Sequence, residues 1–437
     1  MKIFLASVGC RLNQSEIENY AWQFRAAGHS LTATPEDADL VVINTCTVTA
    51  AAASDSRQKI RQAARLGASE IILTGCWSTM YPDEAAALPG VSSLVSNEKK
   101  DRLVVDRLQI SPESFDLEPV TREVVPGARL RTRAFIKVQD GCDNRCAYCI
   151  TALARGSGRS RPINVILENI HRVTQEMILD GTTCSSKTIP AQEIVLTGVH
   201  LGAWGQDFSP PQRLYHLVRA ILEETDVPRL RLSSLEPWDL EREFFNLWGD
   251  PRLCQHLHLP LQSGSEAVLR RMARKTTPTS YAELARLARQ AIPEVAITTD
   301  IIVGFPGETE AEFRESLEFV KEMRFARGHV FSYSARPGTA AARMSGQVPH
   351  ALRKERNAVM RTVLAETETA YQVRFLGRVL PVLWEATTAC SPEGWRLSGL
   401  TGNYLRVNIL APELLWNQIT PVKLVKREGR GLSGVIC

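Results

Sequence analysis

Three cysteines lie close together in the middle part of the 437-residue chain, within the stretch DGCDNRCAYC. Cys142, Cys146 and Cys149 have the spacing C-x3-C-x2-C. Cysteine thiolates are the usual ligands of iron–sulfur clusters, whereas a structural zinc site normally needs four nitrogen or sulfur ligands. Because no fourth ligand is evident nearby, the triplet favours an iron–sulfur cluster over a zinc knuckle.

Three protein ligands on a four-iron cluster leave one iron open to a small molecule. The amino and carboxyl groups of S-adenosylmethionine (SAM) are the natural candidate, and an electron passed through the cluster could then cleave the sulfonium to a radical. Tyr148, directly before the third cysteine, could pack over the adenine of SAM or simply fill the loop.

A second triplet is spread over the first part of the chain. Cys10, Cys46 and Cys76 are 36 and then 30 residues apart, yet each ends a similar stretch: FLASVGC, VVINTC and IILTGC. Each separation is about one βα unit, so parallel neighbouring strands would bring all three thiols to the sheet edge where ligands bind. The alternative is three inert core cysteines. The remaining cysteines share no such pattern and are interpreted as structural or incidental: Cys184, Cys254, Cys390 and Cys437.

The elements that must position these cysteines follow from the apolar pattern. Before residue 115, apolar β-branched stretches alternate with a helix over 50–68, which predicts an N-terminal parallel-sheet α/β domain (1–115). The Pro-containing segment 117–133 is interpreted as a linker. Six strand candidates separated by helices then predict a partial (β/α) barrel over 128–365. They are 134–139, 193–199, 229–234, 256–262, 296–305 and 328–334.

The last part of the chain has a different character. Residues 372–437 consist of short strands separated by Gly, Pro and Asn, which predicts a small β-barrel. A charged helix over 350–375 leads into it. The chain has no apolar run of about 18 residues and no signal-peptide cleavage site, so we expect a cytoplasmic protein with no membrane span.

Charge is weakly informative in total and more so in its distribution. The net charge is only +4. Eight basic residues fall within one short segment, where they form either a solvated surface or contacts to nucleic-acid phosphates. They are Arg129, Arg131, Arg133, Lys137, Arg145, Arg155, Arg159 and Arg161.

Together these features resemble the methylthiotransferase family of radical SAM enzymes, over essentially the whole chain. The tail looks like the RNA-binding TRAM module of that family. The matching motifs are GC-x2-N-Q (9–14), INTC-x-V (43–48), TGC (74–76), QDGC-x3-C-x-YC (139–149), RSRP (159–162), LTG-x-H (196–200), SS-x-EPW (233–238) and TTD-x-IVGFPGET (298–309).

The resemblance implies conversion of a C–H bond to C–SCH3 with two [4Fe–4S] clusters and SAM. The N-terminal cluster would hold the sulfur donor and accept a methyl group from one SAM. The barrel cluster, on the catalytic Cys142, Cys146 and Cys149, would cleave a second SAM to a radical. An electron donor of the flavodoxin or ferredoxin type is expected, and the sulfur source is open.

The resemblance also implies further SAM-side residues. LPLQSGS (259–265) and GFPGE (304–308) look like SAM-side loops of the barrel. His200, His256 and His258 are either acid–base or substrate-contact groups, or satisfied structural histidines. The candidate cofactor-binding residues are Tyr148, Gly198, Glu236, Gln262, Ser263 and Asp300.

Members of the family differ in substrate. The stretches LTGVHLG and SSLEPW resemble the group that modifies C2 of N6-threonylcarbamoyladenosine, next to the anticodon of tRNA. Isopentenyladenosine in tRNA, an aspartate of a ribosomal protein, and a non-catalytic iron–sulfur RNA-binding role remain alternatives. Tyr404, Arg406 and Lys423 would form a stacking-and-charge platform for RNA, unless Tyr404 is core. The departures from the family pattern are an extra loop at 182–190, the lack of a proline near Ala152, and Leu400.

Overall fold

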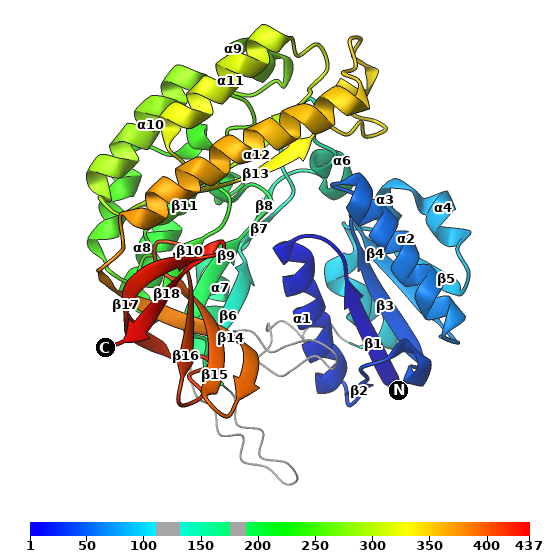
Figure 1. Ribbon diagram of the computed structural model, residues 1–437. Coiled ribbons are helices and arrows are strands. Elements are labelled where there is room, and N and C mark those ends of the chain that lie inside the picture. The colour runs from blue at the N-terminus through cyan, green and yellow to red at the C-terminus, as the bar shows by residue number, and fades with distance from the viewer. Residues whose placement is uncertain (111–131, 175–188) are drawn as a thin grey trace.

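The computed structural model describes residues 1–110, 132–174 and 189–437 (Figure 1). An N-terminal α/β part, an open barrel and a C-terminal closed barrel follow one another along the chain, as the sequence predicts. The proposed domain boundaries at 115 and 128, most of the linker 117–133, Cys184 and positions 182–188 of the extra loop lie outside the described residues. Within the described residues, no helix has the length and apolar character needed to cross a membrane.

The N-terminal part is a five-stranded parallel sheet with the order β2-β1-β3-β4-β5. This order places a topological switch point between β1 and β3, and ligands of doubly wound sheets bind at the strand ends there. The apolar runs that predict strands coincide with β1, β3 and β4, whereas β2 and β5 complete the sheet at its edges. The strands are β1 (Lys2–Ser7), β2 (Ser30–Leu31), β3 (Leu40–Thr45), β4 (Ile71–Gly75) and β5 (Val91–Val95).

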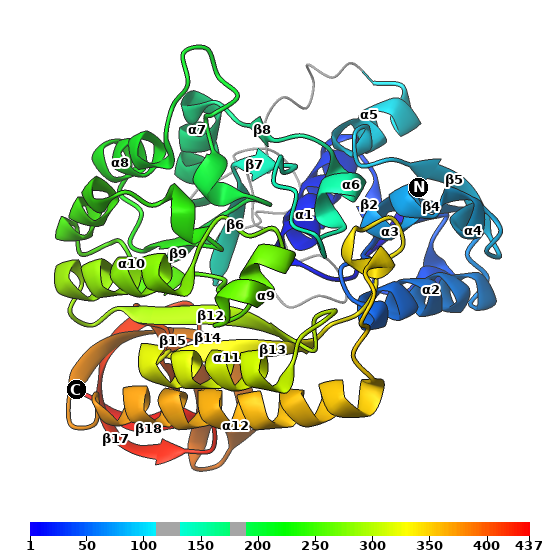
Figure 2. The same cartoon turned by 90° about the horizontal axis from the view of Figure 1, so that it is seen from above.

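Helices cover both faces of this sheet (Figures 1 and 2). One face packs against α1 and α5 through residues such as Phe24 and Val104. The other packs against α2, α3 and α4 through residues such as Ile60 and Trp77. Thr49 caps α2 by accepting a hydrogen bond from the Ala52 amide. The helices are α1 (Arg11–Ala26), α2 (Ala50–Arg65), α3 (Cys76–Met80), α4 (Pro82–Ala86) and α5 (Leu103–Leu108).

The middle part is an open barrel of six parallel strands. Two three-stranded sheets, β6-β9-β10 and β11-β12-β13, are joined by a parallel bridge between Ser234 and His258. α1 of the N-terminal part packs against β6, an outer strand of this arrangement. The strands are β6 (Arg133–Lys137), β9 (Glu193–Thr197), β10 (Leu230–Leu232), β11 (His256–His258), β12 (Ala296–Val303) and β13 (Arg327–Ser332).

Helices surround the barrel, and Figure 2 shows α10 and α11 on its outer side. Thr277 and Thr309 begin α10 and α11 with capping boxes, which fix where both helices start. The helices are α6 (Thr151–Arg155), α7 (Ile163–Thr174), α8 (Leu214–Glu224), α9 (Glu266–Arg271), α10 (Pro278–Ala291), α11 (Glu310–Met323) and α12 (His350–Val373).

The C-terminal part is a closed barrel in the order β14-β15-β16-β18-β17. Its core includes Trp384, and Tyr371 and Phe375 at the end of α12 pack into the same cluster. Figure 1 shows this barrel, orange to red, beside the first strands of the open barrel. The strands are β14 (Val379–Ser391), β15 (Gly394–Thr401), β16 (Arg406–Ala411), β17 (Ile419–Glu428) and β18 (Gly431–Ile436).

Candidate active site

The N-terminal cysteines follow three adjacent strands whose ends lie in register. Ser7 of β1 pairs with Asn44 of β3, and Asn44 pairs with Thr74 of β4. Cys10, Cys46 and Cys76 therefore emerge at one edge of the sheet, two of them beside the switch point. Gly9 has φ +99°, and a Cβ at this position would lie 2.5 Å from the Sγ of Cys46. Only glycine allows this close approach of the first strand end to the second cysteine.

Polar groups hold the three N-terminal thiols. The Cys10 thiol donates to Oδ1 of Asn13 at 3.6 Å, and Nδ2 of Asn97 donates to Sγ of Cys76 at 3.7 Å. The Cys46 amide donates to Oγ of Ser56 at 3.0 Å. Burial, together with smaller contributions from Cys10 and Cys76, raises the pKa of Cys46 to about 11. A bound cationic group would lower the pKa of Cys46 again, because its positive charge would stabilise the thiolate.

The central triplet occupies a loop closed by a short antiparallel ribbon, β7 (Gln139–Asp140) and β8 (Arg159–Ser160). Gly141 begins the loop with φ +74°, and a Cβ there would lie 1.9 Å from the carbonyl oxygen of Ser157. The Cys142 amide donates to the Gly156 carbonyl at 3.0 Å, and the Cys149 amide donates to the Cys146 carbonyl at 3.1 Å. These bonds curl the loop so that its cysteines lie just before α6.

Cationic and histidine side chains approach the central thiols. Nη1 of Arg274 lies 3.9 Å from Sγ of Cys146, and Nη2 of the same residue pairs with Oε2 of Glu236 at 2.7 Å. Arg274 also stacks over the ring of Trp238, 4.4 Å from its centroid. Glu236 and Trp238, both of the SS-x-EPW stretch, thus hold a cation beside the central site.

His200 lies between a carboxylate and the first cysteine of the triplet. Its Nε2 is 2.6 Å from Oδ2 of Asp239. Burial opposes protonation of His200, but hydrogen bonds to Asp239 and Cys142 outweigh it and raise its pKa to about 10. Asn144 contacts the other ring nitrogen, Nδ1, at 3.3 Å. Contacts with Asp239, Asn144 and Cys142 hold the His200 ring beside the first cysteine of the triplet.

Three further sequence candidates differ in their surroundings within the barrel. Tyr148 packs against the small cluster that contains Met272 and Phe305. A Cβ at Gly198 would lie 3.1 Å from the Gln139 side chain, so β9 passes close to β7. Gln262 has a positive φ of 73°, a strained conformation typical of functional loops.

Ser263 and Asp300 have partners within the protein. The buried Ser263 hydroxyl accepts from the Ser265 amide at 3.2 Å. Burial opposes ionisation of Asp300, but hydrogen bonds with His258 and His329 outweigh it and hold its pKa below the ordinary value. Asp300 therefore groups with these two histidines, and the contacts described for it do not include the cysteine loop.

Tyr404 is not exposed for the proposed RNA platform on the C-terminal barrel. It stacks on His256 of the open barrel, with centroids 4.1 Å apart and planes 8° apart. Arg406 pairs with Glu385 at 2.6 Å and keeps 38% of its side chain exposed, and Lys423 is exposed. Burial lowers the pKa of His256 well below its ordinary value, so His256 is neutral and structural. Tyr404 is thus an interface residue, the alternative that the sequence left open.

We expect Tyr404→Ala to lower the melting temperature of the protein and Tyr404→Phe to preserve it. Alanine removes the ring that stacks on His256 and under the Arg231 guanidinium, 5.4 Å from its centroid, whereas phenylalanine keeps it. Loss of a buried aromatic ring typically costs about 3–5 kcal/mol. Thermal unfolding measures the change, and an alanine variant as stable as the wild type would contradict the interface role.

The basic segment is not uniformly a solvated surface. Lys137 and Arg155 are buried and take part in internal ion pairs, whereas Arg159 is exposed. Arg129 and Arg131 lie outside the described residues. The buried members cannot contact phosphate, because their charges already face carboxylates inside the protein.

Several residues at the two sites were not found from the sequence. Arg274 and Asp239 lie far from any cysteine in sequence, and Asn97 stands in the unremarkable stretch VSNEKK. Asn13 was visible as part of GC-x2-N-Q, although no role was assigned to it. Of the remaining cysteines, Cys254 is buried and Cys390 and Cys437 are exposed, away from both triplets, as the sequence suggests.

The chemistry of the donor set fits an iron–sulfur cluster at each triplet. Each triplet offers three free thiols, and sulfur is the soft donor that iron–sulfur clusters prefer.

Comparison with known proteins decides the family. A family model described as "Radical SAM superfamily" matches residues 136–320, and one described as "Uncharacterized protein family UPF0004" matches residues 2–96. The threonylcarbamoyladenosine tRNA methylthiotransferase MtaB of Bacillus subtilis is 35% identical, over 96% of this chain and 93% of that protein. The chain belongs to the methylthiotransferase family of radical SAM enzymes. This methylthiotransferase accordingly uses a [4Fe–4S] cluster and SAM.

Other relatives support the same assignment. MtaB of Thermotoga maritima is 38% identical over 87% of this chain and 86% of that protein. The tRNA-2-methylthio-N(6)-dimethylallyladenosine synthase of Chloroflexus aurantiacus is 31% identical over 99% of this chain and 91% of that protein. Among solved structures, the radical SAM methyltransferase TsrM of Kitasatospora setae has a TM-score of 0.55 at 14% identity, covering 78% of this chain and 77% of that chain. That likeness concerns the fold alone.

Proposed function

We propose that this methylthiotransferase adds a methylthio group to C2 of N6-threonylcarbamoyladenosine, next to the anticodon of tRNA. The observation that carries the proposal is the pair of threonylcarbamoyladenosine tRNA methylthiotransferases at 35% and 38% identity, each matched over most of its length. The dimethylallyladenosine synthase of Chloroflexus aurantiacus is less similar, at 31% identity. Dimethylallyladenosine, also called isopentenyladenosine, is therefore the second candidate substrate.

Cys142, Cys146 and Cys149 are proposed to hold one [4Fe–4S] cluster and, through its open iron, SAM. When bound, the cluster and SAM supply the radical chemistry that activates a C–H bond. The protein's own contribution is positional and electrostatic. Arg274, fixed by Glu236 and Trp238, places a positive charge beside Cys146, and the His200 ring lies beside Cys142. The Arg274 charge acts to lower the pKa of the Cys146 thiol, against burial, which raises it.

The remaining candidates are proposed to shape the SAM side of the barrel. Five of them stand on loops of the barrel, where barrel enzymes build their sites, namely Tyr148, Gly198, Glu236, Gln262 and Ser263. Asp300 stands within β12. Gln262 supports this role through its strained backbone, fixed by hydrogen bonds to Asp300 and Ile302 of β12. Electrons would come from a donor of the flavodoxin or ferredoxin type.

Cys10, Cys46 and Cys76 are proposed to hold a second [4Fe–4S] cluster for the sulfur-handling half of the reaction. Three observations support this: the cysteines share one sheet edge, Gly9 lacks a side chain and so lies close to Cys46, and asparagines contact Cys10 and Cys76. The two sites differ in construction. One is a single loop and the other is assembled from three strand ends, which suits a division between radical generation and sulfur transfer.

Nucleoside mass spectrometry of tRNA from cells with and without the gene tests the substrate. We expect the methylthio derivative of threonylcarbamoyladenosine to vanish in the deletion strain. The wild-type gene and a Cys390→Ala variant should restore it, and Cys142→Ala should not. Cys390 is a matched control because it is an exposed cysteine outside both triplets. Loss of methylthio-isopentenyladenosine instead would favour the second candidate, and an unchanged profile would reject both.

A further inference from the structure

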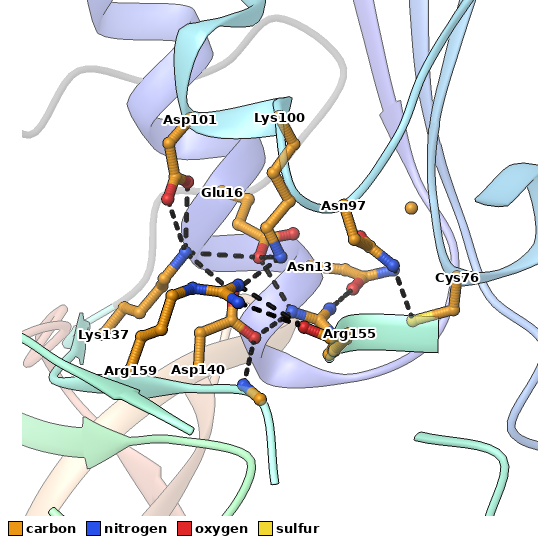
Figure 3. Close-up of polar contacts among 12 residues, drawn as sticks. Asn13, Glu16, Cys76, Asn97, Lys100, Asp101, Lys137, Asp140, Arg155 and Arg159 are labelled. Carbon is orange, nitrogen blue, oxygen red and sulfur yellow. Dashed lines mark hydrogen bonds and ion pairs between the residues drawn. The ribbon is translucent and has the colours of Figure 1, made fainter. Parts of the chain in front are cut away.

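Five charged side chains are buried together where the N-terminal part meets the central cysteine loop (Figure 3). None is more than 5% exposed at its side chain. Glu16 stands on α1 and Lys100 precedes α5, whereas the others stand on or beside β6, β7 and α6. The group, here termed the junction cluster, consists of Glu16, Lys100, Lys137, Asp140 and Arg155.

The junction cluster contains three cations and only two carboxylates. Oε1 of Glu16 lies 2.6 Å from Nζ of Lys100 and 3.1 Å from Nη1 of Arg155. Asp140 contacts the same two cations, at 2.8 Å and 2.9 Å, and also Lys137 at 3.1 Å. Lys137 is also paired with Asp101 at 3.1 Å, but this carboxylate is 59% exposed and therefore partly screened by water. Counted over the buried side chains alone, the group has one more cation than carboxylates.

Arg155 directs this excess charge toward the N-terminal cysteines. Its Nη2 donates to Oδ1 of Asn13 at 2.7 Å, the atom that also accepts from the Cys10 thiol. Nδ2 of Asn13 donates to the carbonyl of Thr45 at 3.1 Å, directly before Cys46. One guanidinium therefore fixes the asparagine that connects two of the three cysteine segments.

The third cysteine is tied to the same helix. Nδ2 of Asn97 bridges Sγ of Cys76, at 3.7 Å, and the carbonyl of Ala154, at 2.7 Å. Ala154 and Arg155 are neighbours on α6, which packs against α3 where Cys76 begins that helix. α6 also follows Cys149 almost directly. Figure 3 shows Asn13, Asn97, Cys76 and Arg155 side by side on this path.

The Arg155 guanidinium, paired with Glu16 and Asp140, is also within electrostatic range of the sulfur atoms of Cys10 and Cys76. Three thiolates around an iron–sulfur cluster would place negative charge within reach of this buried cation.

We propose that Arg155 is a positioning residue that, through its buried charge, raises the reduction potential of the cluster held by Cys10, Cys46 and Cys76. This inference rests on the proposed function, which assigns a cluster to that site. Reduction adds one electron from a chemical reductant and forms or breaks no bond. A fixed positive charge in a low-dielectric surrounding stabilises the more negative state, so the electron enters more readily.

The test is a redox titration of the reconstituted full-length enzyme with dithionite, followed by electron paramagnetic resonance. The signal that remains when Cys142, Cys146 and Cys149 are replaced by alanine is assigned to the N-terminal site. We expect Arg155→Gln to shift its midpoint potential to a more negative value and Arg155→Lys to keep it near that of the wild type. Glu16→Gln removes a negative charge from the same cluster, so it should shift the potential to a more positive value.

Opposite signs distinguish electrostatics from damage. If the role of Arg155 were purely structural, Arg155→Gln and Glu16→Gln would shift the midpoint potential in the same direction, or neither variant would shift it. Either result would overturn the inference. If Arg155→Gln fails to retain iron, the sign of the Glu16→Gln shift decides. Arg252→Gln is the matched control, because Arg252 pairs with Asp250 outside the junction cluster, and it should leave the potential unchanged.

Iron content separates failure of the inference from failure of the proposed function. A wild-type enzyme with about eight irons and unshifted variants would overturn the role of Arg155 alone. A wild-type enzyme with about four irons, whose only signal disappears when Cys142, Cys146 and Cys149 are replaced by alanine, would overturn the second cluster, and the inference with it.

Discussion

Joint replacement of Cys142, Cys146 and Cys149 by alanine is expected to abolish SAM cleavage and tRNA methylthiolation completely. The loop between β7 and α6 places these thiols together through backbone bonds, and alanine cannot ligate iron. Iron after anaerobic reconstitution should fall from about eight to about four per chain, since four-iron clusters are expected at both triplets. Iron analysis and chromatography of the SAM products measure the two effects.

The complementary variant tests the division between the sites. Joint replacement of Cys10, Cys46 and Cys76 by alanine should remove the other half of the iron and all methylthiolation, while SAM cleavage persists. Cys390→Ala with Cys437→Ala is the control, because both cysteines are exposed and outside the triplets. An unchanged iron content in the central variant would show that the assigned ligands are wrong.

The position of both cysteine triplets in the fold could be predicted because it depends on local patterns. The central triplet lies within one loop, and the N-terminal triplet repeats the same strand-to-cysteine transition three times. Parallel pairing then brings equivalent strand ends to one edge, which is a property of the sheet and not of any particular contact. The edge strand β5 was missed because VSSLV contains two exposed serines and lacks a continuous apolar run.

The supporting residues could not be predicted, because their partners are distant in sequence. Lys100 meets Glu16 across 84 positions, and Arg155 meets Asn13 across 142. Charged residues are most often exposed to solvent, so the local sequence predicts a surface position for each of these residues. Burial of these charges depends on how α1 packs against β6, which only the tertiary structure reveals.

Tyr404 illustrates the same limit on the C-terminal barrel. Tyr404 lies in the turn between β15 and β16, and the sequence of a turn does not show whether another domain covers it. Here the open barrel covers it, and the Tyr404 ring stacks on His256. The fold of the tail was therefore predicted correctly, whereas this contact with the open barrel was not visible in the sequence.

Glu193→Ala is expected to destabilise the interface between the open barrel and the C-terminal barrel by about 3–5 kcal/mol. This is the usual cost of leaving buried cations without their partner. The fully buried Glu193 pairs with Arg231 at 2.6 Å and with Arg229 at 3.3 Å. These arginines donate to backbone carbonyls of the C-terminal barrel, Arg229 to Leu400 and Arg231 to Thr401. Thermal unfolding should show a lower melting temperature, and hydrogen exchange should show faster opening around Leu400.

The pH dependence of this effect follows from the pKa of Glu193. Burial alone would raise that pKa, but Arg231 and Arg229 outweigh burial and lower it from 4.5 to about 2. The unfolded chain therefore takes up a proton before the folded protein does, so the stabilisation is present above the ordinary pKa and is lost as the pH falls from 4.5 toward 2. The difference in free energy of unfolding between the wild type and Glu193→Gln should decrease as the pH falls over that range. Glu223→Gln, which removes an exposed partner of Arg219, is the control. A difference that stays constant with pH would mean that Glu193 stabilises the interface between the two barrels by packing and not by its charge.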